Sequence, residues 1–374
     1  MTRYARVESL KSDLGVADLV DIPAQQLDEG EVSARIERIA LTTNNMTYAV
    51  YGDTLGYWNL FPAEQPGYGC MPAWGHAEIV ESRASDLPVG TRVFGYFPIA
   101  TQLTMRPTSV TSRSFVDGAE HRTGTPQVYN LYEFEPRDSD PRLDSLTAIF
   151  RALFITSYTA ADYLRDRDFF DAEQFVISSA SSKTAYGTAY CLADSPAEKI
   201  ALTSARNIDF VKGLGHYAAA HEYADLTAID STKRTVYVDL SGDPALRRRV
   251  HEHFGDRLAF DCLIGSTQAD GFPEEDKSLV GPAPVFFFAA LQLDAYKADG
   301  QSRAFMQRYR RDERDFLERA GGTEQPSITL LEHTGLEDAP AVIAGFHDGS
   351  TDPAVGHIFL PKRGLITATR PRTD

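Results

Sequence analysis

Cysteine is scarce in this chain: there are only three, Cys70, Cys191 and Cys262, among 374 residues. They lie far apart and none belongs to a C-x-x-C pair, which excludes a zinc lobe built from four thiolates. A small, odd number of cysteines is typical of a protein that folds without disulfides in a reducing compartment. We therefore expect a cytoplasmic protein.

Long apolar runs are also missing. The strongest run is APVFFFAAL, Ala283 to Leu291, and it is far shorter than the ~20 residues that a membrane-spanning helix needs. The first residues, MTRYARVESLKSDLG, contain no apolar stretch of the signal-peptide kind. We therefore expect no membrane partner.

Basic residues are fewer than acidic ones, 37 Lys and Arg against 53 Asp and Glu, so the formal net charge is −16. A surface this acidic repels phosphate backbones, which argues against nucleic acid as a partner. A small anionic cofactor remains compatible, because local charge can oppose the net charge. The hydrophobic content of 43% is that of a globular protein, and a prior of ~150 residues per domain favours two domains.

The first third of the sequence is rich in short β-branched and aromatic runs that Gly, Pro and Asp interrupt, such as VSARIERIAL and TRVFGYFPIA. This pattern predicts a β-rich N-terminal unit. The segment 104–145 is polar, contains proline and lacks regular periodicity. Its length indicates a functional loop or an excursion over a cleft.

Strand and helix patterns alternate after residue 145. Buried strands are expected at 174–180, 199–204, 234–242 and 257–265, with helices between them. Asp243 as the cap, Pro244 at the first position and Gly255 at the stop define one of these helices. Such alternation requires parallel pairing with right-handed crossovers, so we predict an α/β protein with a doubly wound parallel sheet.

The order of a β-rich unit, a βαβ unit and a β-rich tail resembles the medium-chain dehydrogenase/reductase superfamily. Three stretches carry the likeness: CMPAWGHAEIVES at 70–82, LPVGTRVFGYFP at 87–98, and SYTAADYL with the strand and loop that follow it. The resemblance implies a GroES-like catalytic domain at 1–147, a Rossmann-type nucleotide-binding domain at 148–321, and a C-terminal return to the catalytic domain at 322–374. It also implies a homodimer.

Other phrases resemble a bacterial family known as a domain of unknown function, near the quinone oxidoreductases of that superfamily. These phrases are LTTNNMTYAVYGDTLGYWNLFPA, HRTGTPQVYNLY, SSASSKTAYG and PVFFFA. Membership implies the fold and the cofactor, and it supplies no substrate.

The zinc site of the superfamily is missing. Its catalytic zinc needs a cysteine near position 43 and a His-Glu pair at the GHE stretch, where this chain has Thr43, His76 and Ala77. One possible ligand remains, and catalytic Zn²⁺ needs three protein ligands and a water. We therefore predict no metal and a zinc-independent protein.

The glycine-rich phosphate loop is also altered. The loop after the first strand of the βαβ unit reads SSASSKTAYG, and of the usual glycines only Gly187 is present. A buried strand, a turn of small residues and a helix N-terminus still form a setting that attracts phosphate. We assign cofactor binding to Ser181, Ser182, Lys183, Thr184 and Gly187, and also to Gly265 at the end of the fourth strand. The alternative is a degraded site on an inherited fold.

The residues after the second strand favour NADP(H) over NAD(H). The resemblance places an acid there in NAD-binding proteins, and Arg or Lys where a 2′-phosphate is bound. This chain has Ser204 and Arg206, and Lys183 from the preceding loop completes a phosphate pocket. The alternative for Arg206 is a solvated residue at the start of a helix.

The zinc-free relatives present polar side chains of the N-terminal domain to the nicotinamide. The matching residues predict Tyr48 as proton donor and Asn44 or Asn45 as the hydrogen-bond donor to an oxyanion. His76, at the former zinc-ligand position, is a second candidate proton donor. For each residue a turn or a packing role is the alternative. The polar and aromatic residues of the 104–145 segment are assigned to substrate: His121, Tyr129, Asn130 and Tyr132.

These assignments favour a zinc-independent, NADP(H)-dependent oxidoreductase that reduces a small carbonyl, enone or quinone. Two alternatives stay open. The first is a redox-neutral lyase or C–C bond-cleaving enzyme on the same fold, and the second is a cofactor-binding protein without catalysis. The run Arg247 to Arg249 is interpreted as a solvated helix face, and His251 and His253 point to different faces of that helix, which argues against metal chelation.

Overall fold

The computed structural model describes residues 3–264, 278–322 and 327–361. The chain divides into two compact units. Unit 1 contains residues up to 148, residues 330–351 and the chain from 357, whereas unit 2 contains 149–329 and 352–356. The first boundary lies at 148/149, beside the expected 147/148. The chain returns to unit 1 at 330 rather than at 322, and a short piece of the C-terminal segment belongs to unit 2.

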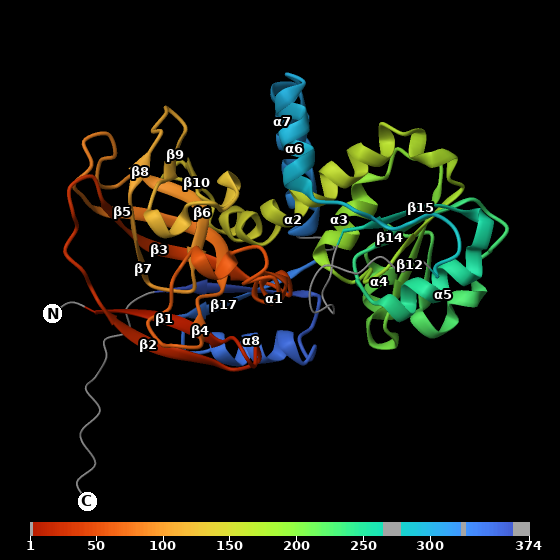
Figure 1. Cartoon of the computed structure of the whole chain (residues 1–374), viewed down its shortest axis with the longest axis horizontal. Coiled ribbons are helices and arrows are strands. Elements are labelled where there is room, and N and C mark those ends of the chain that lie inside the picture. The colour runs from red at the N-terminus through yellow and green to blue at the C-terminus, as the bar shows by residue number, and fades with distance from the viewer. Residues whose placement is uncertain (1–2, 265–277, 323–326, 362–374) are drawn as a thin grey trace, which may run out of the picture. The chain divides into compact units, whose positions relative to one another are not determined.

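Unit 1 is built on a nine-stranded sheet with the order β17-β18-β3-β5-β6-β10-β9-β8, and β7 also pairs with β3 (Figure 1). Its strands are β3 (Val32–Leu41), β5 (Pro72–Ser82), β6 (Arg92–Pro98), β7 (Gln102–Met105), β8 (Pro107–Thr108), β9 (Ser114–Asp117), β10 (Leu131–Phe134), β17 (Thr329–Thr334) and β18 (Val355–Leu360). A second sheet holds β2 (Ala17–Pro23), β1 (Arg3–Leu10) and β4 (Tyr68–Gly69). Its helical elements are α1 (Asn44–Val50), η1 (Tyr57–Asn59), η2 (Glu120–Arg122), η3 (Gln127–Tyr129) and α8 (Ala339–His347).

The segment 104–145 is more regular than the sequence predicts. β8, β9 and β10 extend the large sheet, and only the two short turns η2 and η3 interrupt them. Phe115 and Tyr132 face each other across β9 and β10, and both are fully buried. These strands have two to four residues each, too few for a periodicity to show, because an alternating pattern needs about four to eight residues.

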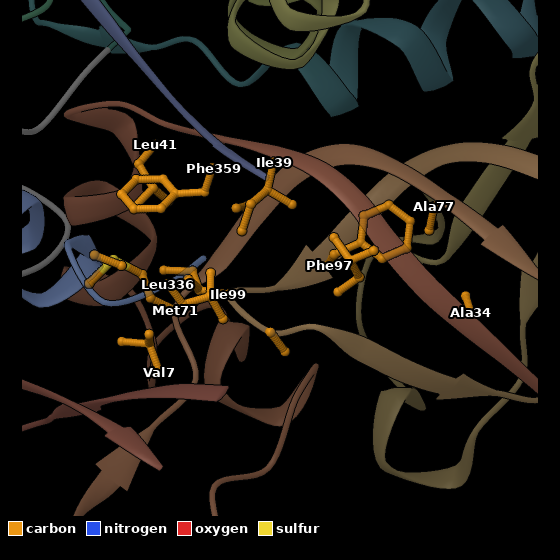
Figure 2. Close-up of a cluster of buried hydrophobic side chains, with 14 of the residues drawn as sticks. Val7, Ala34, Ile39, Leu41, Met71, Ala77, Phe97, Ile99, Leu336 and Phe359 are labelled. Carbon is orange, nitrogen blue, oxygen red and sulfur yellow. The ribbon is translucent and has the colours of Figure 1, made fainter. Parts of the chain in front are cut away.

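The core of unit 1 lies on one face of the large sheet. It joins side chains from distant parts of the sequence, among them Val7, Ile39, Phe97 and Phe359 (Figure 2). Leu336 and the α8 residue Ile343 pack into the same cluster. The C-terminal segment therefore completes a core that the first hundred residues begin.

Unit 2 contains a six-stranded, all-parallel sheet with the order β13-β12-β11-β14-β15-β16. The strands are β11 (Gln174–Ile177), β12 (Glu198–Thr203), β13 (Ala219–Glu222), β14 (Thr235–Asp239), β15 (Leu258–Leu263) and β16 (Val285–Phe286). Numbered along the chain, this is the order 3-2-1-4-5-6 of dinucleotide-binding sheets. The predicted fold class is confirmed: a β-rich unit and a doubly wound parallel sheet.

Helices accompany these strands in unit 2. They are α2 (Pro141–Arg165), whose first residues belong to unit 1, and η4 (Asp168–Asp171), α3 (Lys183–Cys191), η5 (Ala205–Asn207), α4 (Ile208–Gly213), η6 (Tyr223–Ala228), α5 (Pro244–Phe254), η7 (Gly255–Arg257), α6 (Ala289–Ala298) and α7 (Ser302–Ala320). The start of α5 follows the sequence prediction, because the Asp243 carboxylate accepts hydrogen bonds from the amides of Ala245 and Leu246. Among the described residues, no helix is long and apolar enough to cross a membrane.

Candidate functional site

The carboxyl ends of β11 and β14 form the switch point of the parallel sheet. These strands are neighbours, and the connections that follow them lead to opposite sides of the strand order, which is where open α/β sheets bind ligands. Ser178, directly after β11, donates a 2.8 Å hydrogen bond to Asp239 at the end of β14. The same carboxylate accepts hydrogen bonds from the amides of Ser241 and Gly242. One buried carboxylate therefore fixes both loops at this edge.

Serines occupy the positions in this loop where a typical phosphate loop has glycines. Ser179 has a positive φ of 46°, a conformation that glycine adopts more readily, and its amide donates to the Tyr223 hydroxyl at 3.1 Å. Ser182 caps α3 by accepting a hydrogen bond from the Ala185 amide. The amides of Lys183 and Thr184 make no hydrogen bond within the described part of the chain. They remain available to an anion at the start of α3.

Lys183 is turned towards the C-terminal segment. Its ammonium lies 3.3 Å from the carbonyl oxygens of Pro353 and Val355, both within unit 2. Burial lowers the pKa of Lys183 to about 8, although the nearby Asp352 opposes this shift. Lys183 therefore anchors the 352–356 segment beside the loop.

Gly187, the one glycine kept from the motif, allows α3 to approach α2 closely. A Cβ atom at this position would lie 2.9 Å from the Ser157 hydroxyl. That hydroxyl donates to the carbonyl of Thr184 in the first turn of α3 at 2.8 Å. Gly187 thus serves helix packing rather than contact with a ligand.

Ser204 and Arg206 follow the carboxyl end of β12, next to the altered loop. The Asn207 amide group bonds the Ser181 hydroxyl at 3.0 Å and ties the two segments together. Arg206 is exposed, and within the described residues its guanidinium has no hydrogen bond or ion pair. This free cation lies at the edge where the sequence predicts a phosphate. Gly265 lies outside the described residues.

Behind this edge lies a buried charge network that corrects one interpretation of the sequence. Arg247 is buried rather than solvated: it pairs with Asp239 and lies 3.4 Å from Asp261. His251 bonds Asp261 at 2.8 Å, and burial raises the pKa of that carboxyl group. The helix α5 faces two carboxylates from neighbouring strands, and the spacing along α5 alone does not reveal them.

In unit 1, Tyr48 is the centre of a cluster of aromatic residues. Its hydroxyl accepts a 3.1 Å hydrogen bond from the Trp74 indole, and its ring contacts Tyr57 and Tyr96. The Tyr129 hydroxyl bonds that of Tyr57 at 2.9 Å. Burial raises the pKa of Tyr48 above its ordinary value. The phenol therefore keeps its proton at neutral pH and can donate it.

The two asparagines before Tyr48 differ in their roles. The Asn45 side chain is buried, accepts from the Thr42 amide at 2.7 Å and donates to the Pro72 carbonyl at 2.7 Å. Both ends of this amide hold the start of α1 in place, so Asn45 acts as a positioning residue. Asn44 is half-buried and lies beside the Tyr48 hydroxyl, where it lowers the pKa of the phenol slightly against the effect of burial.

His76 lies on the same strand as Trp74, two residues away, and therefore on the same face of the sheet. It is buried, its ring meets the edge of Phe94, and its Nε2 lies 3.7 Å from a carboxylate oxygen of Asp144. Arg92 pairs with the other oxygen of Asp144 at 2.6 Å. The structure thus brings His76 and Tyr48 to one face of unit 1.

The predicted substrate residues separate into two groups. Tyr129 joins the Tyr48 cluster, whereas Tyr132 is fully buried and packs in the sheet core. Arg122 connects this segment: it pairs with Asp117 at 3.0 Å and donates to Asn130 and Tyr132. Asn130 and Tyr132 therefore act as internal supports, because their polar atoms are occupied and buried.

His121 remains: it lies in η2, the first of the two turns of this segment, next to Arg122, and its side chain is exposed. Desolvation and the Arg122 guanidinium lower its pKa. His121 is thus a neutral imidazole at neutral pH, and it stays a predicted substrate contact.

Three residues of the aromatic cluster were not predicted: Tyr57, Trp74 and Tyr96. Trp74 and Tyr96 lie opposite each other in the pairing of β5 with β6. The sequence shows the alternation of side chains within each strand. It does not show the pairing register of β5 with β6, which places Trp74 opposite Tyr96. Within the described residues, no group of three or more His, Cys, Asp or Glu side chains is placed to hold a metal ion.

Comparison with known proteins supports this reading of the fold. A family model described as a protein of unknown function (DUF2855) matches residues 39–352. No curated protein matches the sequence. Among solved structures, CurA of Vibrio vulnificus in complex with NADPH has a TM-score of 0.62 at 11% identity, covering 96% of this chain and 100% of that one.

Two further structures share the fold. A putative NADPH:quinone reductase from Bacillus thuringiensis has a TM-score of 0.57 at 11% identity, and the match covers 96% of this chain and 99% of that one. The YhdH oxidoreductase from Salmonella enterica in complex with NADP has a TM-score of 0.56 at 12% identity, with 96% and 100% covered. At these identities the likeness concerns the fold.

Proposed function

The chain belongs to the DUF2855 family, and on that premise we propose that it is an NADP(H)-dependent oxidoreductase that reduces a small carbonyl, enone or quinone without zinc. The observation that carries the proposal is the switch point of the parallel sheet, with two amides at the start of α3 that make no hydrogen bond to any described residue. Solved structures of this fold in complex with NADPH or NADP add support.

The residues at this edge fit a dinucleotide. The amides of Lys183 and Thr184 suit its pyrophosphate, since a helix N-terminus favours negative charge. Arg206 suits a 2′-phosphate, because its exposed guanidinium has no partner in the described part of the chain and can bind phosphate with two parallel hydrogen bonds. No acidic residue directly follows β12. In NAD-binding proteins such a residue accepts a hydrogen bond from the ribose hydroxyl, so its absence here favours NADP(H) over NAD(H).

When bound, the cofactor supplies a hydride. The chain then has to supply a proton and a hydrogen bond to the substrate oxygen, and Tyr48 with Asn44 offers both groups. The indole of Trp74 holds the Tyr48 oxygen in place, and the surrounding rings exclude water from the phenol. The cluster of rings favours a planar substrate, such as a quinone or an enone.

The direct test is to mix the protein with NADPH and one member of each substrate class, a quinone, an enone and an aldehyde, and to follow NADPH absorbance. We expect oxidation of NADPH with at least one class, at an undiminished rate after treatment with a chelator. Absence of turnover with all three, despite NADPH binding, would contradict the reductase proposal and favour a binding protein.

A further inference from the structure

A pocket lies in unit 2, away from the candidate nucleotide edge. It has a volume of about 910 Å³, and residues of α2, α3, α7 and the loop before β13 line it. Lys199, in its wall, stands at the beginning of β12, whereas Ser204 follows the end of that strand. The two residues are five positions apart along the strand, a distance of ~17 Å. The pocket therefore lies at the opposite end of the sheet from the candidate cofactor loops.

Positive and negative charges nearly balance in the wall of this pocket, although the chain is acidic overall. Its wall contains five Lys and Arg residues and four aspartates. On one side the charges neutralise each other: Arg165 pairs with Asp194 at 2.7 Å and with Asp162 at 3.2 Å, and Arg311 pairs with Asp312. The arginines on this side are therefore already paired with carboxylates and do not require an anionic ligand.

The other side is different. Within the described residues, Lys199 and Arg319 form no ion pair, and the Lys199 ammonium donates only to the Leu192 carbonyl at 3.3 Å. His216 lies close to both cations: burial, then Arg319 and then Lys199 lower the pKa of its imidazole. The ring of Tyr190 lies 5.7 Å from the His216 ring and roughly perpendicular to it. Two cations, an imidazole and an aromatic ring thus share one corner without a carboxylate bonded to either cation.

We propose that Lys199, His216 and Arg319 bind the phosphate group of a small organic phosphate, whose remaining part lies against Tyr190 in the pocket. Lys and Arg provide charge-assisted hydrogen bonds to phosphate oxygens, and the volume is that of a small-molecule site. A bound phosphate dianion offsets the positive charges of Arg319 and Lys199, which lower the pKa of His216, and so favours the protonated imidazole. Binding should therefore draw a proton onto His216 and show uptake of protons near neutral pH.

The test uses phenyl phosphate as the probe, with phenol as the uncharged comparison, in calorimetric titrations in two buffers of different ionisation enthalpy. We expect phenyl phosphate, and not phenol, to bind with proton uptake. Arg319→Gln and Lys199→Gln should each weaken binding about tenfold or more, since each removes one charged hydrogen bond. His216→Gln should remove the proton uptake. Arg257→Gln, an exposed arginine outside the pocket wall, is the matched control and should leave the affinity unchanged.

Two results would overturn the proposal. The first is the absence of phenyl phosphate binding to the intact protein. The second is binding that Arg206→Gln abolishes and Arg319→Gln leaves unchanged, which assigns the anion to the nucleotide edge. The side chains of Arg319 and Arg206 are both exposed, so circular dichroism of either variant should match that of the parent protein.

Discussion

At the scale of single residues, the proposed reduction depends on a buried phenol. Tyr48 is surrounded by aromatic rings and held by one indole N–H, and its raised pKa keeps it protonated. A neutral phenol beside a reducible bond can donate its proton, and the Trp74 indole N–H that bonds its oxygen stabilises the phenolate that remains. Loss of the Tyr48 hydroxyl alone should therefore affect turnover.

Tyr48→Phe should therefore lower kcat by about 100-fold or more, the range that positioned acids contribute, with little loss of NADPH affinity. The measurement is steady-state turnover together with a cofactor titration. Tyr68→Phe is the matched control, since Tyr68 bonds Asp18 in the small sheet. Unchanged turnover in Tyr48→Phe would remove Tyr48 from the mechanism.

Lys183 gives a prediction on pH and stability. Its pKa in the folded protein is about 8, below the ordinary value of ~10.4 of an unfolded chain. Between these two values the unfolded state binds more protons than the folded state, so the contribution of Lys183 to the free energy of unfolding rises with pH. That contribution is complete above the unfolded pKa and is lost as the pH falls through about 8.

Chemical denaturation of the parent protein and of Lys183→Gln checks this prediction. The parent should gain stability relative to the variant as the pH rises from about 8 towards 10. The lost hydrogen bonds to Pro353 and Val355 give an offset that does not vary with pH. A stability difference that stays flat over this range would show that Lys183 is not desolvated.

At the scale of elements, α3 connects the altered loop to the packing of the sheet. Gly187→Ala places a Cβ 2.9 Å from the Ser157 hydroxyl and disturbs its bond to Thr184. Overpacking of this kind costs about 1–3 kcal/mol. Gly213→Ala in α4 is the matched control, because a Cβ there meets nothing within 4 Å, and a helical alanine is favoured over glycine.

Urea denaturation compares the two variants. We expect Gly187→Ala to unfold at lower urea than the parent, and Gly213→Ala to match or exceed the parent. Equal stability of Gly187→Ala and the parent would mean that α3 and α2 have room between them, against the packing described.

Local signals predicted α5 well and the outer strands of unit 1 poorly. Asp243 and Pro244 fix the start of α5 through bonds to the next few residues, so they can be read from the sequence. The strands β8 and β9 are defined by their partners across the sheet, and Arg247 is buried because Asp239 and Asp261 come from two other strands. Those facts depend on register and on long-range pairing.

The candidate site also contains residues that the sequence could predict and residues that it could not. The loop of hydroxyl residues and Arg206 follow strands that the sequence predicts, so their common edge could be expected. Tyr57 and Trp74 could not, since their contacts with Tyr48 arise from chain segments that only folding brings together.

At the scale of the whole molecule, the chain combines a GroES-like β-rich unit with a Rossmann-type unit, and we predict that it works without a catalytic zinc. Thr43 and Ala77 occupy two of the ligand positions, and His76 is buried beside Asp144 and Phe94. Elemental analysis of the purified protein should find no stoichiometric zinc. A full equivalent of zinc would contradict the ligand argument.

The central claim is that the switch point of unit 2 binds NADP(H) through Arg206, and one experiment tests it most directly. The protein is titrated with NADPH and, separately, with NADH, followed by nucleotide fluorescence, in the parent, in Arg206→Ala and in the control Arg257→Ala. Arg257 is exposed and lies just before β15, at the other end of the sheet. We predict tighter binding of NADPH than of NADH, and a loss of about tenfold or more in NADPH affinity alone in Arg206→Ala. An equal loss for both nucleotides, or no binding of either by the parent protein, would contradict the account.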